Sequence, residues 1–217
     1  TVASGLFVAT LTNQVGPIRE KVFKSLIFMP MSISFVSAAT IWGFLYANVP
    51  PGRPEIGLLN ALVEVFGGQP QPWMLISDFR LNSFLLMIII IWLQTGFSMV
   101  LISAAIKGVP EETIEAARVD GAGNIQLFWK IILPQIWGTV MSVFITVVIG
   151  VMKIFDIVLA MTGGTFDTSV LGFQFYQEYF LNANVGRASA IVAVLTVLIV
   201  PLMIIQVVTF RRQEAMR

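Results

Sequence analysis

The sequence contains no cysteine and no histidine among its 217 residues. The lack of cysteine excludes disulfide bonds and thiolate metal sites, and the lack of histidine removes the commonest general base and metal ligand. Charge is also scarce, because Asp, Glu, Lys and Arg together make up only 12% of the chain. Hydrolase triads and zinc centres are therefore poor candidates, and the chain is not expected to be an enzyme.

Apolar residues are abundant. Hydrophobic residues make up 57% of the chain and its mean hydropathy is +0.86, well above the values of ordinary soluble domains. This composition predicts a polytopic protein surrounded by membrane lipid. The 13 basic residues are dispersed and the net charge is +1, so no nucleic acid is expected as a partner.

Phosphate-binding motifs are missing as well. No GxxxxGK[ST] sequence occurs, and the pair Gly121 and Gly123 is followed by Gln126 where a dinucleotide-binding loop would have its third glycine. We therefore expect the chain to bind no ATP, no other cofactor and no metal. Any energy from ATP has to come from a partner subunit.

Four apolar segments predict helices that cross the bilayer, at residues 22–46, 82–106, 135–161 and 188–210. Residues 1–12 are also apolar but reach only roughly half of the ~20 residues that a crossing needs, so we expect them to be the end of a longer helix. No strand-like alternation or internal repeat is evident. The prediction is one all-α transmembrane domain over residues 1–217.

The basic residues set the predicted orientation. They concentrate in three segments that the positive-inside rule assigns to the cytoplasm: Arg19, Lys21 and Lys24; Lys107, Arg118 and Lys130; and Arg211, Arg212 and Arg217. The exterior connections are then residues 48–80, with a short surface helix at 58–66, and a glycine-rich stretch between the last two spans.

Residues 108–134 (GVPEETIEAARVDGAGNIQLFWKIILP) form a long charged segment between two apolar spans. Pro110 followed by Glu111, Glu112 and Glu115 predicts a helix start, because carboxylates stabilise the positive end of the helix dipole. Ile114, Ala117 and Val119 are expected to form a short apolar face, and Gly121 and Gly123 to end the helix before a second one.

This segment resembles the EAA loop of permease subunits of bacterial ABC importers, in the order of Glu115, Ala116, Ala117, Asp120 and Gly121 and in Ile131, Leu133 and Pro134 further on. In that family the short helix is a cytoplasmic coupling helix, which lies in a groove of the ATPase subunit and transmits its closure to the membrane helices. The alternative is an amphipathic connecting helix that has no partner.

Polar residues inside the spans are the other candidates for function. Lys153 and Asp156 are spaced to lie on one helix face, as a pair in a transport pathway or as a structural pair. Gln94, Thr95 and Gly96 interrupt an apolar span, where they can serve interhelical hydrogen bonds or a substrate. With Trp92 and Phe97 beside them, the amide and aromatic groups suit a neutral sugar ring.

Longer segments narrow the resemblance. FMPMSIS at 28–34, WLQTGFSMVLISAAIKGVPEETIEAARVDGA at 92–122, FDIVLAMTGG at 155–164 and the tail with Arg211 and Arg212 are similar to maltose-type carbohydrate ABC permeases, and most to α-glucoside permeases. The resemblance covers essentially the whole chain. It implies an all-α polytopic bundle of the ABC importer permease type in the bacterial cytoplasmic membrane.

The resemblance also implies partners and a sugar site. The partners are a second homologous permease, a dimer of ATPase subunits that holds ATP and Mg, and an extracytoplasmic sugar-binding protein. By position, the sugar site falls on Leu93, Gln94, Phe97, Gly150, Val151, Ile154 and Asp156. Val151, Lys153 and Ile154 replace asparagine-rich positions of the maltose pattern, and the loop after Gly164 lacks a third glycine and a proline, so the sugar and its contacts can differ.

The sequence therefore predicts an importer permease for an α-glucoside, a disaccharide or a glucosylated compatible solute, working by alternating access. Residues 50–54 and 162–170 are expected to meet the binding protein, unless they are plain connectors. An ion-coupled secondary transporter that uses Lys153 and Asp156, and a channel, are the alternatives.

Overall fold

The computed structural model describes the backbone of residues 1–49 and 56–215. This described part consists of α-helices, short 3-10 and π-helices and connecting turns, without a β-strand. Three of its helices are long and apolar enough to cross a membrane, and a broken pair makes a fourth if it is counted as one span. The predicted all-α membrane bundle is confirmed.

The chain divides into two compact units. Unit 1 comprises Thr1–Ser32, Gln94–Gly150 and Leu198–Arg217, and unit 2 comprises Ile33–Leu93 and Val151–Val197. Two long helices, α5 (Leu81–Lys107) and α11 (Val185–Ala215), are divided between the units, with one part of each in unit 1 and the other part in unit 2.

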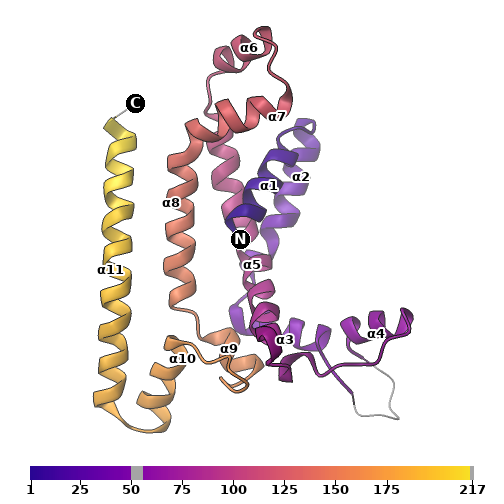
Figure 1. Cartoon of the computed structure of the whole chain (residues 1–217), viewed down its shortest axis with the longest axis vertical. Helices are drawn as coiled ribbons and strands as arrows, with labels where there is room; N and C mark the ends of the chain where they lie inside the picture. The colour runs from indigo at the N-terminus through magenta and orange to yellow at the C-terminus, as the bar shows by residue number, and fades with distance from the viewer. Residues whose placement is uncertain (50–55, 216–217) are drawn as a thin grey trace. The chain divides into compact units, whose positions relative to one another are not determined.

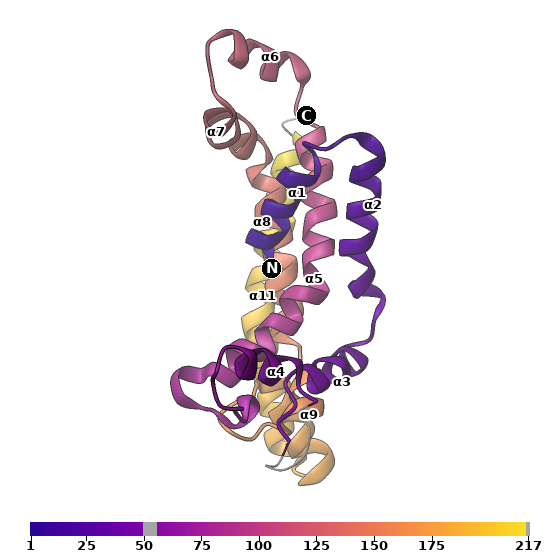
Figure 2. The ribbon, with the colours of Figure 1, turned by 90° about the vertical axis from the view of Figure 1, so that its right-hand side faces the viewer.

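Unit 1 is built around the C-terminal half of α5. The helices α1 (Val2–Thr12) and α2 (Pro17–Phe28) lie beside it, as Figures 1 and 2 show, and α8 (Leu133–Met152) completes the packing. Met99 and Ile102 of α5 are fully buried against Ala9 of α1 and against the valines of α8. Their burial fixes the end of α5 from which the charged loop continues.

Small residues allow this close packing. A Cβ atom added to Gly5 of α1 would lie 2.4 Å from the Cβ of Ser98, and one added to Gly96 would lie 2.6 Å from the carbonyl oxygen of Ile27. Thr95 and Ser4 place their hydroxyl oxygens 2.8 Å apart. Thr95 and Gly96 therefore serve contacts between helices, which was one of the two alternatives for that polar interruption.

The first predicted span, residues 22–46, is wrong as one continuous helix. It begins earlier, at Pro17, passes through a 3-10 turn at Met29–Ser32 and starts again as α3 (Phe35–Leu45). Pro30 lacks the N–H that would continue the ladder, and the hydroxyl of Ser34 accepts a hydrogen bond from the Ser37 N–H at 3.1 Å. A new helix start is thus encoded within the apolar run.

Unit 2 has its own core. Ile89 and Leu93 of α5, Ala38 and Tyr46 of α3, and Ile157 of α9 (Asp156–Met161) are buried together. The surface helix predicted at 58–66 is α4 (Leu58–Val65), which lies to the right of α3 in Figure 1. Buried Asn60 of α4 holds the following segment through its amide, by accepting from the Gln71 N–H at 2.9 Å and donating to the Gln71 carbonyl at 3.1 Å.

The third predicted span, residues 135–161, also needs correction. The helix α8 ends at Met152, and a turn in which the Ile154 N–H donates to the Val151 carbonyl at 3.1 Å separates it from α9. The stretch predicted as a glycine-rich exterior connection contains α10 (Leu171–Tyr176) and a π-helix at Gln177–Leu181. Its Phe173 is buried in the core of unit 2, so the segment is packed against the rest of that unit.

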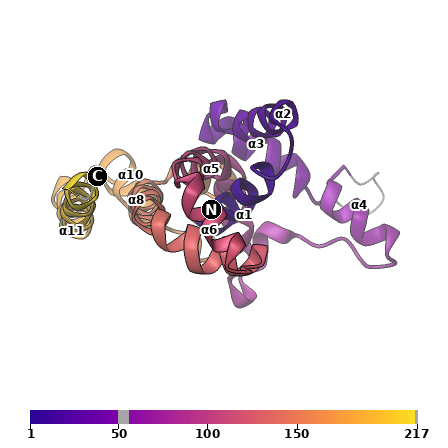
Figure 3. The same cartoon turned by 90° about the horizontal axis from the view of Figure 1, so that it is seen from above.

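The last predicted span is confirmed as α11, which is somewhat longer than expected. Its most apolar window has no buried residue. Within unit 1 its C-terminal part lies beyond α8, apart from α1, α2 and α5 (Figures 1 and 3), and Gln206 donates to the hydroxyl of Thr146 of α8 at 2.8 Å. Its apolar side chains are therefore available to lipid or to another subunit.

Candidate functional site

The charged loop of unit 1 forms a separate short helix, α6 (Glu111–Val119), as the sequence predicts. Pro110 is the N-cap residue, Glu111 and Glu112 occupy the first turn and Arg118 the last, so both ends carry charges that oppose the helix dipole. The Thr113 N–H donates to the Pro110 carbonyl at 3.2 Å. The helix is thus specified by its own residues.

Gly121 ends α6 in a Schellman motif. Its φ is +83°, its N–H donates to the Arg118 carbonyl at 3.0 Å, and the Ala122 N–H donates to the Ala117 carbonyl at 3.0 Å. A positive φ is readily adopted only by glycine. No atom lies within 4 Å of the position that a Cβ would take at Gly121, so the conformation, and not a lack of space, requires this residue.

Most of the residues around α6 that carry the resemblance to the EAA loop are exposed to solvent. Glu115, Ala116, Asp120 and Gly121 are exposed, whereas Ala117 is only 7% exposed and anchors the helix. The predicted apolar face holds for Ile114 and Ala117, but Val119 is 87% exposed because it lies five positions after Ile114, on another side of the helix. The structure therefore leaves the motif residues other than Ala117, and Val119 with them, open to a partner.

The chain beyond Gly121 carries further exposed apolar groups. The short helix α7 (Asn124–Leu127) leads through a π-helix at Phe128–Ile132 into α8. Ile125 and Trp129 of this stretch are exposed, as is Val119, whereas Leu127 is buried and holds α7 in place. A charged loop that presents large apolar side chains is typical of a docking surface.

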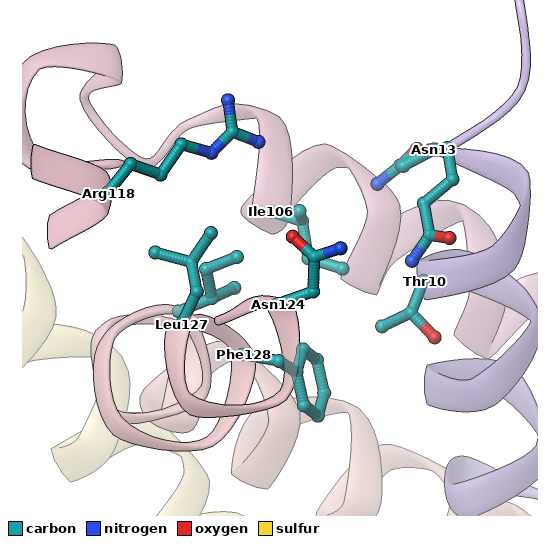
Figure 4. A pocket seen from close by; sticks show the side chains of 9 residues that line it. Thr10, Asn13, Ile106, Arg118, Asn124, Leu127 and Phe128 are labelled. Carbon is teal, nitrogen blue, oxygen red and sulfur yellow. The ribbon is translucent and has the colours of Figure 1, made fainter. Parts of the chain in front are cut away.

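A cavity of about 480 Å³ lies beside this loop in unit 1 (Figure 4). Arg118 of α6 and Asn13 at the end of α1 reach toward it from opposite sides, and Asn124 and Phe128 lie between them. The charged loop is thus open along this side, while Ala117 and Ile114 hold α6 against the rest of unit 1.

A polar cluster ties the neighbouring helix ends together. Glu20 of α2 is ion-paired with Lys24 and with Lys107, the last residue of α5. Lys24 also donates to Ser103 of α5 and, at 3.1 Å, to the Oδ1 atom of Asn13. These ion pairs and hydrogen bonds therefore join the ends of α1, α2 and α5 next to the link that leads to α6.

Sequence reasoning missed this cluster because its members are far apart in the sequence. Glu20 is the only acid among the bases of the first basic segment, and a lone carboxylate there was the available signal.

The residues proposed for the sugar site divide between the two units. In unit 1, the Nε2 atom of Gln94 lies 4.0 Å from the position that a Cβ of Gly150 would take, so these two residues of α5 and α8 are neighbours. Phe97 is half-buried against the unit 1 core. Gln94 and Phe97 share one side of α5, as their spacing predicts.

In unit 2, Leu93 and Ile154 are core residues with 2% and 6% exposure. Val151 is exposed, and half-buried Asp156 is the first residue of α9. Lys153 lies in the turn after α8, so Lys153 and Asp156 do not share a helix, and among the described side chains no ion pair joins them. The predicted pairing on one helix face is wrong, because the helix breaks between them.

The predicted contact loop at residues 162–170 is closely held within unit 2. Four of its residues, Gly163, Gly164, Phe166 and Asp167, have positive φ values between 54° and 70°. Buried Asn82 of α5 donates to the carbonyl oxygen of Phe166 at 2.6 Å, and the Phe166 side chain is 47% exposed. The other predicted contact segment, residues 50–54, lies outside the described residues.

The described side chains include no group of three or more Asp, Glu, His or Cys residues that could hold a metal ion.

Comparison with known proteins identifies relatives over almost the whole chain. The profile of a family described as "Binding-protein-dependent transport system inner membrane component" matches residues 2–214. The alpha-glucoside transport system permease protein AglF of Rhizobium meliloti is 50% identical over 201 residues, which cover 92% of this chain and 59% of AglF. The osmoprotective compounds uptake permease protein GgtC of Synechocystis sp. is 47% identical over 217 residues, covering 100% of this chain and 76% of GgtC. The chain thus spans about three fifths of the length of AglF.

Among solved structures, a bacterial alginate ABC transporter in complex with an alginate pentasaccharide-bound periplasmic protein has a chain that superposes with a TM-score of 0.82. The identity is 20%, and the match covers 97% of this chain and 72% of the other. At this identity the likeness shows the fold.

Proposed function

Because the chain belongs to the family of binding-protein-dependent transport system inner membrane components, we propose that it is the permease subunit of an ATP-driven importer for a small neutral glycoside. The observation that carries the proposal is α6 itself. It is an accessible helix with a Schellman end, it bears Glu115, Ala116, Asp120 and Gly121 on its surface or at its end, and it lies between two membrane-spanning helices.

The substrate class follows from the relatives. AglF is named for α-glucosides and GgtC for osmoprotective compounds, and both share about half of their aligned residues with this chain. An α-glucoside, a disaccharide or a glucosylated compatible solute has the size and the neutral hydroxyl groups that Gln94 and Phe97 suit, by hydrogen bonding and by ring stacking. These two side chains, with Gly150 beside Gln94, are the proposed sugar contacts in unit 1.

The proposed mechanism is alternating access driven from the cytoplasmic side. A dimer of ATPase subunits, which holds ATP and Mg, would receive α6 and move it as the dimer closes. The link of Gly108, Val109 and Pro110 transmits that movement to α5, and the ion pair of Lys107 with Glu20 transmits it to α2. The chain itself supplies no catalytic group to this cycle.

The remaining partners are a second homologous permease, which would share the pathway, and an extracytoplasmic sugar-binding protein, which would dock on the exterior loops. The proposed location is the cytoplasmic membrane, with the charged loop inside. The alternative of an ion-coupled transporter loses its motivation, because Lys153 and Asp156 are separated by the end of α8.

The proposal is tested by isolating the full-length chain from its own cells with its associated proteins. We expect an ATPase to co-purify, and we expect ATP hydrolysis to rise when a binding protein loaded with an α-glucoside is added to the complex in lipid discs. Transport of a panel of glycosides without any ATPase subunit would contradict the proposal.

A further inference from the structure

A second polar pocket lies in unit 2, in the segment that joins α9 to α11. It has a volume of about 450 Å³, within the range of roughly 300 to 1,000 Å³ that small-molecule sites occupy. Its polar lining comes from Ser169, Gln174, Gln177, Glu178 and Arg187. None of these residues belongs to the sugar site or the charged loop described above.

The pocket is held by a defined backbone. Gln174, Gln177 and Glu178 are three and four positions apart along α10 and the following π-helix, so they face the same side. The Asn184 N–H donates to the Glu178 carbonyl at 2.8 Å, and the Asn184 side chain accepts from the Arg187 N–H at 3.1 Å. The turn into α11 thus brings Arg187 opposite Glu178.

The charges in the pocket are balanced. The Nη1 atom of Arg187 and the Oε1 atom of Glu178 are 3.6 Å apart, and no other charged side chain lines the cavity. The charges of Arg187 and Glu178 offset each other, so the lining carries no net charge that would attract an ionic solute. This lining therefore favours a neutral ligand.

The hydrogen-bonding groups favour a ligand with many hydroxyls. Gln174 and Gln177 are exposed, and within the described part of the chain their side-chain amides make no hydrogen bond. Each amide offers donors and an acceptor, as does the hydroxyl of Ser169, and a sugar hydroxyl needs both kinds of partner. Ala190 and Ile191 supply an apolar wall for the C–H face of a sugar ring.

We propose that this pocket is a saccharide subsite, which holds a neutral glycoside through Gln174, Gln177, Glu178 and Arg187 before it enters the membrane pathway. The inference rests on the proposed function, which puts this segment on the extracytoplasmic side. It adds a site for the same class of substrate, at residues separate from Gln94, Phe97 and Gly150.

The test uses the complete transporter in lipid discs and a photoreactive α-glucoside, 4-azidophenyl α-D-glucopyranoside. After illumination, mass spectrometry maps the labelled peptides. We expect label in residues 169–191, removed by excess maltose, and we expect the double variant Gln174→Ala, Gln177→Ala to lower that label about tenfold. Gln69→Ala, an exposed glutamine elsewhere in unit 2, is the matched control and should label as the parent does.

Stimulation of ATP hydrolysis by the glycoside-loaded binding protein is measured on the same samples. If hydrolysis is stimulated but residues 169–191 carry no label, or if the double variant labels like Gln69→Ala, the subsite is wrong while the proposed function stands. If no glycoside stimulates hydrolysis, the proposed function fails and the subsite fails with it.

Discussion

Lys107, the last residue of α5, is ion-paired with Glu20 of α2, with 2.6 Å between its Nζ atom and the carboxylate Oε1 atom. Only Gly108, Val109 and Pro110 separate Lys107 from the start of α6. The Glu20 side chain is 11% exposed and that of Lys107 is 56% exposed, so this half-exposed pair adds only about 0 to 1 kcal/mol to stability. The pair matters because it joins α5 to α2 close to the start of α6.

This pair gives the first prediction. Lys107→Ala should reduce ATP hydrolysis that depends on the loaded binding protein while changing thermal stability little, because the end of α5 beside α6 loses its ion pair with α2 but Lys24 keeps its own contacts. Glu20→Gln should lower both the ATP hydrolysis and the stability. The loss of stability should be about 1 to 3 kcal/mol, because Lys24 is left without its charged partner. Lys21→Ala is the control, because Lys21 is an exposed lysine of α2 outside the charged loop. If Lys107→Ala and Lys21→Ala show the same sugar-stimulated ATP hydrolysis, the ion pair transmits nothing.

The second prediction concerns Gly121, whose φ of +83° costs an L-residue about 1 to 2 kcal/mol. Gly121→Ala should weaken transport by changing the exit of the chain from α6, and Gly121→Trp should abolish it by blocking the docking of Glu115 and its neighbours, while the protein still inserts. Gly123→Ala is the matched control, because Gly123 has a φ of −70° and equally open surroundings. An assembled Gly121→Trp complex with normal sugar-stimulated hydrolysis would refute the docking role.

The third prediction places sugar recognition on α5. Gln94→Ala or Phe97→Ala should each weaken apparent affinity by about 1 to 3 kcal/mol, roughly ten- to hundredfold, or reorder the preferred glycosides, and should leave ATPase coupling intact. Gln206→Ala is the control, because that amide already donates to Thr146. An unchanged substrate profile in Gln94→Ala would assign Gln94 to helix packing.

The fourth prediction uses the loop at residues 162–170. A photo-crosslinker at Phe166 or Thr165 should capture the extracytoplasmic binding protein during turnover. Asn82→Ala should reduce that capture, because the buried amide that donates to the Phe166 carbonyl at 2.6 Å is lost. The yield is read on denaturing gels, with Gln69→Ala, an exposed amide outside both predicted contact segments, as control. Absence of any such crosslink while transport proceeds would make the loop a plain connector.

The fifth prediction concerns packing. Gly96→Ala would place its Cβ 2.6 Å from the Phe28 Cα and the Ile27 carbonyl oxygen, both backbone atoms that cannot yield without moving α2. The variant should be destabilised by about 1 to 3 kcal/mol. Gly43→Ala is the matched control, because Gly43 also lies inside a helix and its Cβ would meet only the Met161 Sδ atom, at an ordinary distance of 3.8 Å, so the variant should be no less stable than the parent in thermal unfolding of the purified complex. Equal stability of the two variants would mean that α2 and α5 are not in this close contact.

Hydropathy predicted the long helices well. The segments 82–106 and 188–210 became α5 and α11, because unbroken apolar runs of that length have few other stable forms in a membrane. It failed where a local signal overrode the run. Pro30 and Ser34 broke the first span, and the third span ended before Lys153, although its apolar character continues through α9.

The candidate site was likewise predicted only in part from the sequence. The position and ends of α6 followed from Pro110, the neighbouring glutamates and Gly121, and the resemblance to ABC importer permeases was confirmed by the family match and by AglF and GgtC. The contacts of Glu20 with Lys107 and of Gln94 with Gly150 could not be read from one sequence. They depend on how distant helices pack, and no local pattern records that.

The π-helix at Phe128–Ile132 bears on how the length of this protein can vary. A π-turn is equivalent to one residue inserted into an α-helix, with the helix beyond it otherwise unchanged. Deleting one residue within 128–132 would therefore leave a continuous α-helix and keep Leu133–Met152 facing the same neighbours. The same deletion a few positions later would turn every following side chain of α8 by about 100°. Homologues aligned with this chain should thus carry single-residue gaps at the start of α8 and not within it.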